Sequence, residues 1–222
     1  MSLIVLKVGG SSARQAAEHV LHFVANGHGV CVVHGAGPQI SAEMTRRGLP
    51  VEFVEGRRVT SAETLEVVRE SFGRVNAELC AALGPAAVGL MGDEIGLPAT
   101  QVPELGLVGT PLPSAPTPIA EALAGGWVPV VAPLAEGPLN VNADEMAAAL
   151  AVGLGADRLW FLSDVPGLLR YGAVVPSIAA TEAEELLAGG ELEGGILPKL
   201  HAAVVAAKRG VKAEIGATAV IA

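Results

Sequence analysis

A lysine and two glycines near the start of the chain form the first pattern that could take part in chemistry. Lys7 interrupts an apolar run from Leu3 to Val8, and Gly9-Gly10 follow at once. A lysine is rarely fully buried unless it is paired, and glycines let a backbone approach a ligand closely. The alternative is a lysine at a strand end whose amino group reaches water. We favour a functional role for Lys7.

A second glycine-containing turn, His34-Gly35-Ala36-Gly37, links an apolar strand to a helix. Backbone N–H groups at such a turn suit an anion, although a tight strand-to-helix turn with no ligand has the same pattern. Ile40 stands where the dinucleotide-binding fingerprint needs its third glycine, and the sequence has no Gly-x4-Gly-Lys-Ser/Thr motif. The chain is therefore not a P-loop enzyme.

The segment Asn140-Val141-Asn142-Ala143-Asp144 follows another apolar strand. Asn142 and Glu145 have the spacing of a helix capping box, which is a structural role. That role does not explain Asn140 or Asp144. We expect Asp144 to lie in the first turn of the helix, close to where lysines could converge.

Two further cations are ambiguous from the residues alone. Lys199 follows Gly194-Gly195 and Pro198 in the first turn of a helix, where a lysine opposes the helix dipole, so it is either exposed or a phosphate ligand. Arg58, in Gly56-Arg57-Arg58-Val59-Thr60, belongs either to a basic surface loop or to a site where it clamps a carboxylate in bidentate fashion.

The elements that must position these residues alternate between apolar strands and helices. This order predicts an α/β fold, a three-layer αβα sandwich with a central, mainly parallel sheet and ligands beyond the carboxyl ends of its strands. We expect residues 50–59 to be irregular and 92–118 to form hairpins or a flap. We expect a division near residue 140, with lobes 1–139 and 140–222 sharing one sheet. The expected strands are 3–8, 30–33, 86–90, 128–132, 158–163, 211–215 and 217–221, and the expected helices are 13–26, 38–48, 61–83, 117–125, 143–154, 181–188 and 197–209.

Composition narrows the class of protein. Of 222 residues, 51% are apolar and 17% are charged, so the chain can bury a large core. The net charge of −9 and the absence of a basic run argue against a nucleic-acid partner. Cys31 and Cys80 lie in apolar segments and are expected to be buried thiols. Because the first expected strand begins almost at Met1, we expect no leader peptide, and no apolar run reaches roughly 18–20 uncharged residues, which favours a cytoplasmic protein without membrane contact.

Taken together, six segments resemble the amino-acid kinase family, and within it the branch that phosphorylates N-acetyl-L-glutamate. They occur in the order of the family and cover nearly the whole chain. The segments are Lys7-Val8-Gly9-Gly10, His34-Gly35-Ala36-Gly37, Gly56-Arg57-Arg58-Val59-Thr60, Asn140-Val141-Asn142-Ala143-Asp144, Leu162-Ser163-Asp164-Val165-Pro166-Gly167 and Gly195 to Lys199.

The resemblance implies ATP-dependent phosphorylation of the γ-carboxylate of N-acetyl-L-glutamate, a step of arginine biosynthesis. Within one kinase domain, residues 1–139 would form the lobe for substrate binding and dimerisation, and residues 140–222 the lobe for nucleotide binding. Lys7 and Lys199 would flank the transferring phosphoryl group, and Asp144 would hold both ammonium groups. Gly10, Gly35 and Gly37 would offer N–H groups to phosphoryl oxygens and substrate. Mg²⁺ would arrive on the ATP phosphates, without a metal ligand from the protein. The implied substrate-binding residues are Gly10, Gly35, Ala36, Gly37, Arg58, Asn140 and Asn142; the implied nucleotide-binding residues are Gly9, Ser163, Asp164, Val165, Pro166, Gly167, Leu168, Leu169, Glu191, Leu192 and Glu193.

Departures from the family pattern add expectations. Ala36 replaces a usual glycine and should narrow the substrate turn, and the regions 92–118 and after Val211 are short. The extra N-terminal helix of arginine-inhibited hexameric members is absent, so we expect an arginine-insensitive homodimer. The alternatives are a kinase of a carrier-linked aminoadipate or glutamate, a non-catalytic binding module and, on Gly35-Ala36-Gly37 alone, a nicotinamide-dependent oxidoreductase. Carbamate, uridylate and aspartate kinases fit the motifs less well.

Overall fold

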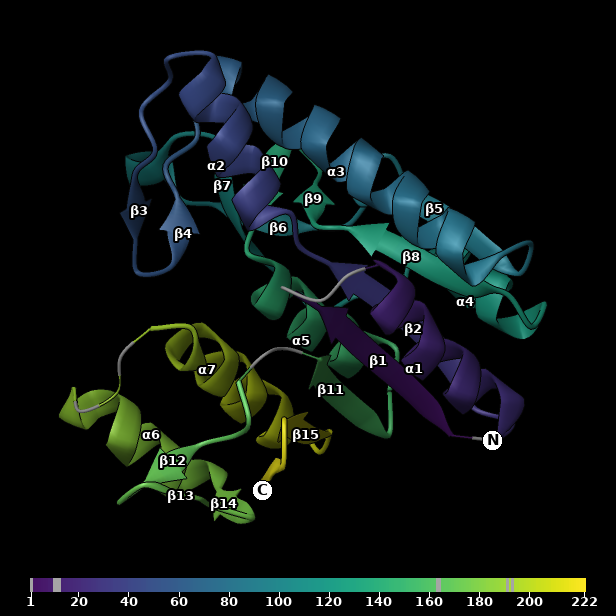
Figure 1. Cartoon of the computed structure of the whole chain (residues 1–222), viewed down its shortest axis with the longest axis vertical. Coiled ribbons are helices and arrows are strands. Elements are labelled where there is room, and N and C mark those ends of the chain that lie inside the picture. Colours follow the sequence, from purple (N-terminus) through teal and green to yellow (C-terminus); the bar gives the residue numbers. More distant parts are fainter. Residues whose placement is uncertain (1, 10–12, 163–164, 191, 193) are drawn as a thin grey trace.

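An eight-stranded sheet forms the centre of the computed structural model, which describes residues 2–9, 13–162, 165–190, 192 and 194–222 (Figure 1). In the described part of the chain, neighbouring strands run parallel except for β15 and β16. The spatial order is β14 (Ser177–Ala179), β16 (Thr218–Ile221), β15 (Lys212–Ile215), β11 (Arg158–Leu162), β1 (Leu3–Val8), β2 (Gly29–His34), β8 (Val128–Ala132) and β5 (Ala87–Met91).

Helices cover both faces of this sheet, which confirms the predicted αβα sandwich. One face carries α1 (Ala13–Ala25) and α3 (Ala62–Leu83), and α2 (Gly37–Arg46) packs on α3. The other face carries α4 (Thr117–Ala124), α5 (Ala143–Gly153) and α7 (Ile196–Ala207), with α6 (Ala180–Gly189) packed on α7. No helix in the described ranges is long and apolar enough to cross a membrane.

The pleat of β1 decides which way Lys7 points. Successive side chains of a strand face opposite sides of a sheet. Leu6 and Val8 belong to the apolar cluster under α1 and α3, whereas Val5 belongs to the cluster under α5 and α7. Lys7 has the parity of Val5, so its side chain lies on the face covered by α5 and α7.

The predicted division near residue 140 falls inside a continuous sheet. Strands β1, β2, β8 and β5 come from residues before 140, and β11, β15, β16 and β14 come from residues after it. The two halves meet where β1 pairs with β11. The expectation of one shared sheet is confirmed, while the assignment of separate functions to the two lobes stays a prediction.

Smaller elements surround one end of the sheet. A second sheet has the order β6 (Ala99–Gln101), β7 (Val108–Pro111), β10 (Leu139–Val141) and β9 (Leu134–Ala135), with a short 3-10 helix η1 (Pro103–Leu105) between β6 and β7. The expected hairpins within 92–118 therefore exist in part, as the antiparallel pair β6–β7. A third small sheet is the hairpin β12 (Leu169–Arg170) and β13 (Ala173–Val174).

The prediction of an irregular segment at 50–59 is wrong. This segment contains the hairpin of β3 (Phe53–Val54) and β4 (Arg57–Arg58). Its two turn residues, Glu55 and Gly56, both have positive φ, at 50° and 78°. Such a pair closes a two-residue hairpin turn whose twist matches its strands.

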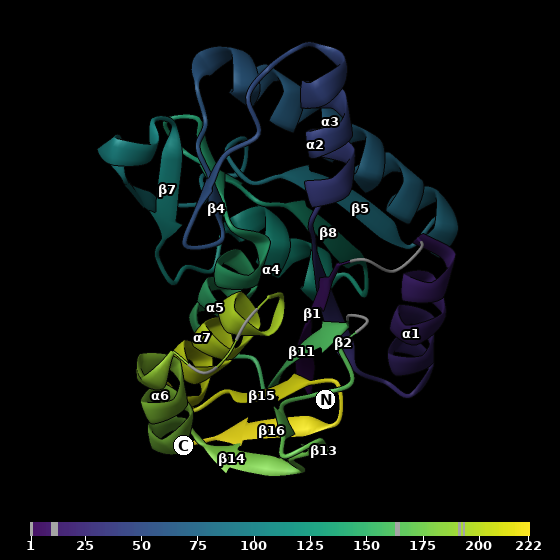
Figure 2. The same cartoon turned by 60° about the vertical axis from the view of Figure 1, so that its left-hand side comes forward.

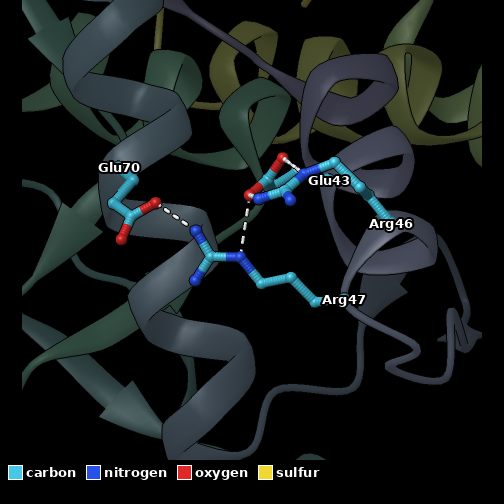
Figure 3. A network of polar contacts seen from close by, with 4 residues as sticks. All are labelled: Glu43, Arg46, Arg47 and Glu70. Carbon is cyan, nitrogen blue, oxygen red and sulfur yellow. Dashed lines mark hydrogen bonds and ion pairs between the residues drawn. The ribbon is translucent and has the colours of Figure 1, made fainter.

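A network of surface ion pairs holds α2 against α3 (Figure 3). Glu43 accepts hydrogen bonds from Arg46 and Arg47, and Arg47 also bonds Glu70 of α3. The hydrogen bonds from Arg46, the larger effect, and from Arg47 lower the pKa of Glu43 to about 2. The network fixes a helix whose first residues border the site described next.

Candidate active site

Lys7, Asp144 and Lys199 come together from three elements at one end of the sheet. Lys7 Nζ at the end of β1 lies 2.9 Å from Asp144 Oδ1, and Lys199 Nζ in the first turn of α7 lies 3.6 Å from Asp144 Oδ2. All three residues are buried. Figure 2 shows α5 and α7, which carry Asp144 and Lys199, side by side. The alternative of an exposed Lys199 is therefore wrong.

Each oxygen of Asp144 faces an ammonium group, so a single carboxylate orients two lysines. Burial makes this arrangement demanding, because buried charges are stable only when they are paired. Lys199 Nζ also donates to the carbonyl of Gly195, 3.2 Å away. The result is a pair of held ammonium groups next to a cavity, which suits a multiply charged anion such as a phosphoryl group.

Gly9 leaves the space that the Lys7 amino group occupies. A Cβ placed on Gly9 would lie 2.5 Å from Lys7 Nζ. The N–H group of Gly9 is bonded to the carbonyl of Leu162 at 3.2 Å. Because Gly9 has no side chain, the amino group of Lys7 can occupy this space. The predicted contact of Gly9 with nucleotide stays a prediction.

One detail predicted for the glycine turn is wrong. The N–H group of Gly35 donates to the carbonyl of Val8 at 3.0 Å, in continuation of the β1–β2 pairing, so it is not offered to a ligand. Gly37 opens α2, where N–H groups precede the helical hydrogen-bond ladder. Ala36 is 2% exposed and belongs to the cluster between α2 and α3, so its methyl group presents little surface to the pocket. Gly10 lies outside the described residues.

Asn142 begins α5 and at the same time contacts the β3–β4 hairpin. Its Oδ1 accepts from the N–H groups of Asp144 and Glu145 at 2.8 and 3.2 Å, which confirms the predicted N-cap. Its Nδ2 donates to the carbonyl of Gly56 at 3.1 Å. Glu145 does not complete a capping box, because its carboxylate receives two hydrogen bonds from Arg57 instead.

A cavity of about 170 Å³ lies beside Lys7 and Asp144. Lys7 and Asp144 line this cavity. All of the predicted substrate-binding residues that the structure describes also line it: Gly35, Ala36, Gly37, Arg58, Asn140 and Asn142. Residues that the sequence analysis did not assign to substrate binding complete the wall: Ile40, Phe53, Gly56, Arg57, Phe72, Val108, Val141 and Ala143. Their substrate contacts stay a prediction, but the structure does gather them around one pocket.

Arg58 is the buried cation of this pocket. It is 6% exposed, so the interpretation as a surface loop is wrong. Its guanidinium donates to Ser41 Oγ at 2.8 Å and to the carbonyl of Gly37 at 3.2 Å, and it lies 4.5 Å from the centre of the Phe53 ring. Burial lowers its pKa. Among the described residues no carboxylate lies within ion-pair distance of it. A buried guanidinium without a carboxylate partner among the described residues suits a carboxylate ligand.

Asn140 connects the floor of the pocket to the Arg58 strand. Its Nδ2 donates to Thr60 Oγ1 at 3.0 Å, and Thr60 Oγ1 donates to the carbonyl of Arg58 at 2.7 Å. Both Asn140 and Thr60 are buried. This chain of hydrogen bonds ties the base of the hairpin, where the chain leaves β4, to β10, and it does not reach the hairpin tip at residues 55–56.

The predicted nucleotide segment is only partly described, since Ser163, Asp164, Glu191 and Glu193 lie outside the described residues. Val165 to Leu169 lie against the β15–β16 turn, where the carbonyl of Pro166 accepts from Ala217 N–H at 2.9 Å. Gly167 has a φ of 144°, and the N–H of Leu168 donates to Thr218 Oγ1 at 2.8 Å. The Leu168 side chain is fully buried in the core. Nucleotide contacts of Val165, Pro166, Gly167, Leu168, Leu169 and Leu192 stay a prediction.

An αβα sandwich with two lysines and one aspartate at the end of its sheet is suited to phosphoryl transfer onto a small anionic acceptor. The chain belongs to the amino acid kinase family, which it matches over residues 2–217. This membership overturns the alternative of a nicotinamide-dependent oxidoreductase.

Individual proteins agree with this assignment. The acetylglutamate kinase of Rubrobacter xylanophilus is 46% identical over 225 residues, covering 97% of this chain and 88% of that enzyme. Among solved structures, smu.665 from Streptococcus mutans UA159 has a TM-score of 0.87 and 28% identity, covering 99% of this chain and 98% of that one. Carbamate kinase from Giardia lamblia bound to AMP-PNP, at 15% identity, has a TM-score of 0.73 over 99% of this chain and 98% of its own, and shows the shared fold.

Proposed function

We propose that this chain transfers the γ-phosphoryl group of ATP to the γ-carboxylate of N-acetyl-L-glutamate, as one step of arginine biosynthesis. The observation that carries the proposal is the placement of Asp144 between Lys7 and Lys199, beside a pocket that contains the buried Arg58. The similarity to an acetylglutamate kinase at 46% identity over 97% of the chain supports this acceptor above a carrier-linked one.

The reaction needs positioned charges more than proton transfer. A γ-carboxylate oxygen of the acceptor attacks the γ-phosphorus, the bond from that phosphorus to the β–γ bridging oxygen breaks, and ADP leaves with N-acetyl-L-glutamyl 5-phosphate as the product. The carboxylate is already ionised at neutral pH, so no general base is required. Lys7 and Lys199 neutralise charge on the phosphoryl oxygens in the transition state, and Asp144 keeps both in position.

The pocket provides the means to hold the acceptor. Arg58 binds its α-carboxylate in bidentate fashion, and the amides of Asn140 and Asn142 lie on the wall where the acetamido group would be accommodated. Because the cavity measures about 170 Å³, it suits a ligand smaller than a drug-sized molecule, whose pockets start at roughly 300 Å³.

We place Mg²⁺ on the nucleotide. Both oxygens of Asp144 face ammonium groups, so this carboxylate is not disposed as a metal ligand. Mg²⁺ commonly binds through substrate phosphates, and here it would arrive with ATP and neutralise part of the phosphate charge. The nucleotide would lie along residues 163–169 and 191–193.

The first test is ADP release with ATP, Mg²⁺ and N-acetyl-L-glutamate, with hydroxylamine present to trap an acyl phosphate. Aspartate, free glutamate and a reaction without acceptor are the controls. The proposal predicts ADP and hydroxamate only with N-acetyl-L-glutamate, and loss of both products in Lys7→Ala and Lys199→Ala. A folded protein that binds ATP but does not turn over this acceptor would redirect the assignment to a carrier-linked acceptor, and one that binds no ATP would favour a non-catalytic module.

We further propose that the enzyme is a cytoplasmic homodimer that arginine does not inhibit. Sedimentation equilibrium measures the first property, and the same ADP assay with added arginine measures the second. A hexameric mass or inhibition by arginine would contradict the proposal.

A further inference from the structure

The β3–β4 hairpin covers the acceptor pocket but has little structure of its own to hold it there. Each strand has two residues, and Phe53 and Val54 are 54% and 47% exposed. Phe53, Gly56, Arg57 and Arg58 nevertheless line the pocket. An isolated two-stranded hairpin is marginally stable at best in water, so contacts outside the hairpin must fix its position.

Those contacts reach the two helices that carry Asp144 and Lys199. Arg57 donates two hydrogen bonds of 2.9 Å to the two carboxylate oxygens of Glu145, the residue after Asp144. The Gly56 carbonyl accepts from Asn142, and a Cβ on Gly56 would lie 3.8 Å from Cβ of Pro198, the residue before Lys199. The hairpin tip therefore lies on the starts of α5 and α7.

The two adjacent arginines of β4 have different partners because a strand alternates its side chains. Both arginines border the pocket, but Arg58 contacts residues of α2, whereas Arg57 contacts α5. The side chains of Arg57 and Glu145 are 22% and 17% exposed, so the pair is partly shielded from water. A partly buried bidentate pair of this kind is stronger than an exposed surface ion pair, which often contributes nothing measurable.

We propose that Arg57 and Glu145 form a clasp that holds the β3–β4 hairpin over the acceptor pocket and thereby keeps Arg58 in place for the acceptor carboxylate. Arg57 is a positioning residue in this inference, since it acts through the hairpin and not on the reacting atoms. The nature of the acceptor rests on the proposed function, whereas the closure of the hairpin does not.

Kinetics test the effect on the acceptor. Arg57→Ala is expected to raise KM for N-acetyl-L-glutamate about tenfold, the lower end of the range for a charged hydrogen bond, while KM for ATP changes less than about twofold. Arg57→Lys, which keeps the charge but loses the planar fork, should be intermediate. Exchange of the two charges in Arg57→Glu with Glu145→Arg should recover most of the loss that either single change causes.

A matched variant separates positioning from general loss of an ion pair. Arg158 and Glu214 form another partly shielded pair, with side chains 35% and 14% exposed, on β11 and β15. Arg158→Ala should lower the midpoint of urea unfolding without changing KM for the acceptor. An equal rise of KM in Arg158→Ala and Arg57→Ala would overturn the clasp.

Amide hydrogen exchange tests closure without any turnover. The Val59 N–H donates to the carbonyl of Glu52 across the base of the hairpin, at 3.1 Å, and reports its opening. In the absence of ligands, Arg57→Ala should exchange at least fivefold faster than the unmodified protein over residues 52–59, with α5 unchanged. Unchanged exchange over 52–59 would overturn the inference, whether or not the protein phosphorylates N-acetyl-L-glutamate. Faster exchange in a protein that fails to use this acceptor would uphold the clasp and refute only the proposed acceptor.

Discussion

Gly9 lies next to the amino group of Lys7, so an alanine at position 9 should displace that amino group without unfolding the protein. The Cβ of an alanine at position 9 would lie 2.5 Å from Lys7 Nζ. Carbon atoms in optimal contact are about 3.5–4.0 Å apart, so the ammonium group must move by about 1 Å. That shift moves Lys7 Nζ out of its 2.9 Å contact geometry with Asp144 Oδ1, while the two opposite charges remain neighbours.

The size of the effect follows from this displacement. A misplacement of about 1 Å can cost about 100-fold in rate, equivalent to about 2.7 kcal/mol of transition-state stabilisation. The fold should tolerate the methyl group, because among the described residues that are not its chain neighbours only the Lys7 side chain lies within 4 Å of the added Cβ, and the backbone of Gly9 does not lie in the left-handed region. We therefore expect Gly9→Ala to change the free energy of unfolding by less than about 1 kcal/mol.

The assay compares kcat from coupled ADP release with the free energy of unfolding from urea titration. Gly73→Ala is the matched control, because Gly73 is exposed on α3 and an added Cβ there meets no atom within 4 Å in the described part of the chain, apart from its own helix backbone and chain neighbours. Gly73→Ala should retain the kcat of the unmodified chain. A Gly9→Ala protein whose kcat stays within about threefold of the original would refute the reasoning, as would a Gly9→Ala protein that fails to fold.

Three further outcomes follow from burial and charge. Asp144→Asn removes the carboxylate shared by two buried lysines and should lower the free energy of unfolding by about 3 kcal/mol, measured by urea titration at pH 7. Arg58→Lys keeps a positive charge but loses the planar fork, so KM for N-acetyl-L-glutamate should rise at least about tenfold in the ADP assay, and an unchanged KM would contradict the assigned role. Burial lowers the pKa of His34 from 6.5 to about 4. The free energy of unfolding therefore has its full contribution from neutral His34 above pH 6.5 and loses about 3 kcal/mol as the pH falls toward 4, because the unfolded chain takes up the proton first. Urea titrations at pH 7, 5.5 and 4.5 should show this loss in the unmodified chain and little of it in His34→Gln. Glu43, whose pKa is lowered to about 2, does not obscure the comparison, because the stability linked to it is lost mainly below this pH range.

The sequence could predict elements whose signals are local. The N-cap at Asn142 and the following alanines set the start of α5, which is observed at Ala143. The strand from Val128 to Ala132 has its predicted bounds because an apolar run ends at a proline there. Lys7 could be singled out because a charge in a buried strand is costly unless it is paired, and the structure pairs it with Asp144 beside the pocket.

Other features depend on residues that are distant in the sequence and could not be read from it. The β3–β4 hairpin has two-residue strands and a Glu-Gly turn in place of the Asn-Gly or Asp-Gly that marks such turns. The partner of Arg57 is Glu145, 88 residues away. Gly35 resembled an anion-binding glycine, but its N–H group is bonded to Val8 because the β1–β2 pairing continues past the last strand residue.

The site is divided between rigid and weakly supported elements, and this division should separate turnover from affinity. Lys7 and Asp144 belong to a buried central strand and a buried helix, and Lys199 to a helix packed on that one. A one-residue shift of β1 would turn Lys7 to the face under α1 and α3 and remove it from Asp144 altogether. Arg58, in contrast, is carried by a hairpin that depends on side-chain contacts with α2 and α5. Substitutions in β1, α5 and α7 should therefore act mainly on kcat, and substitutions in the hairpin mainly on KM for the acceptor.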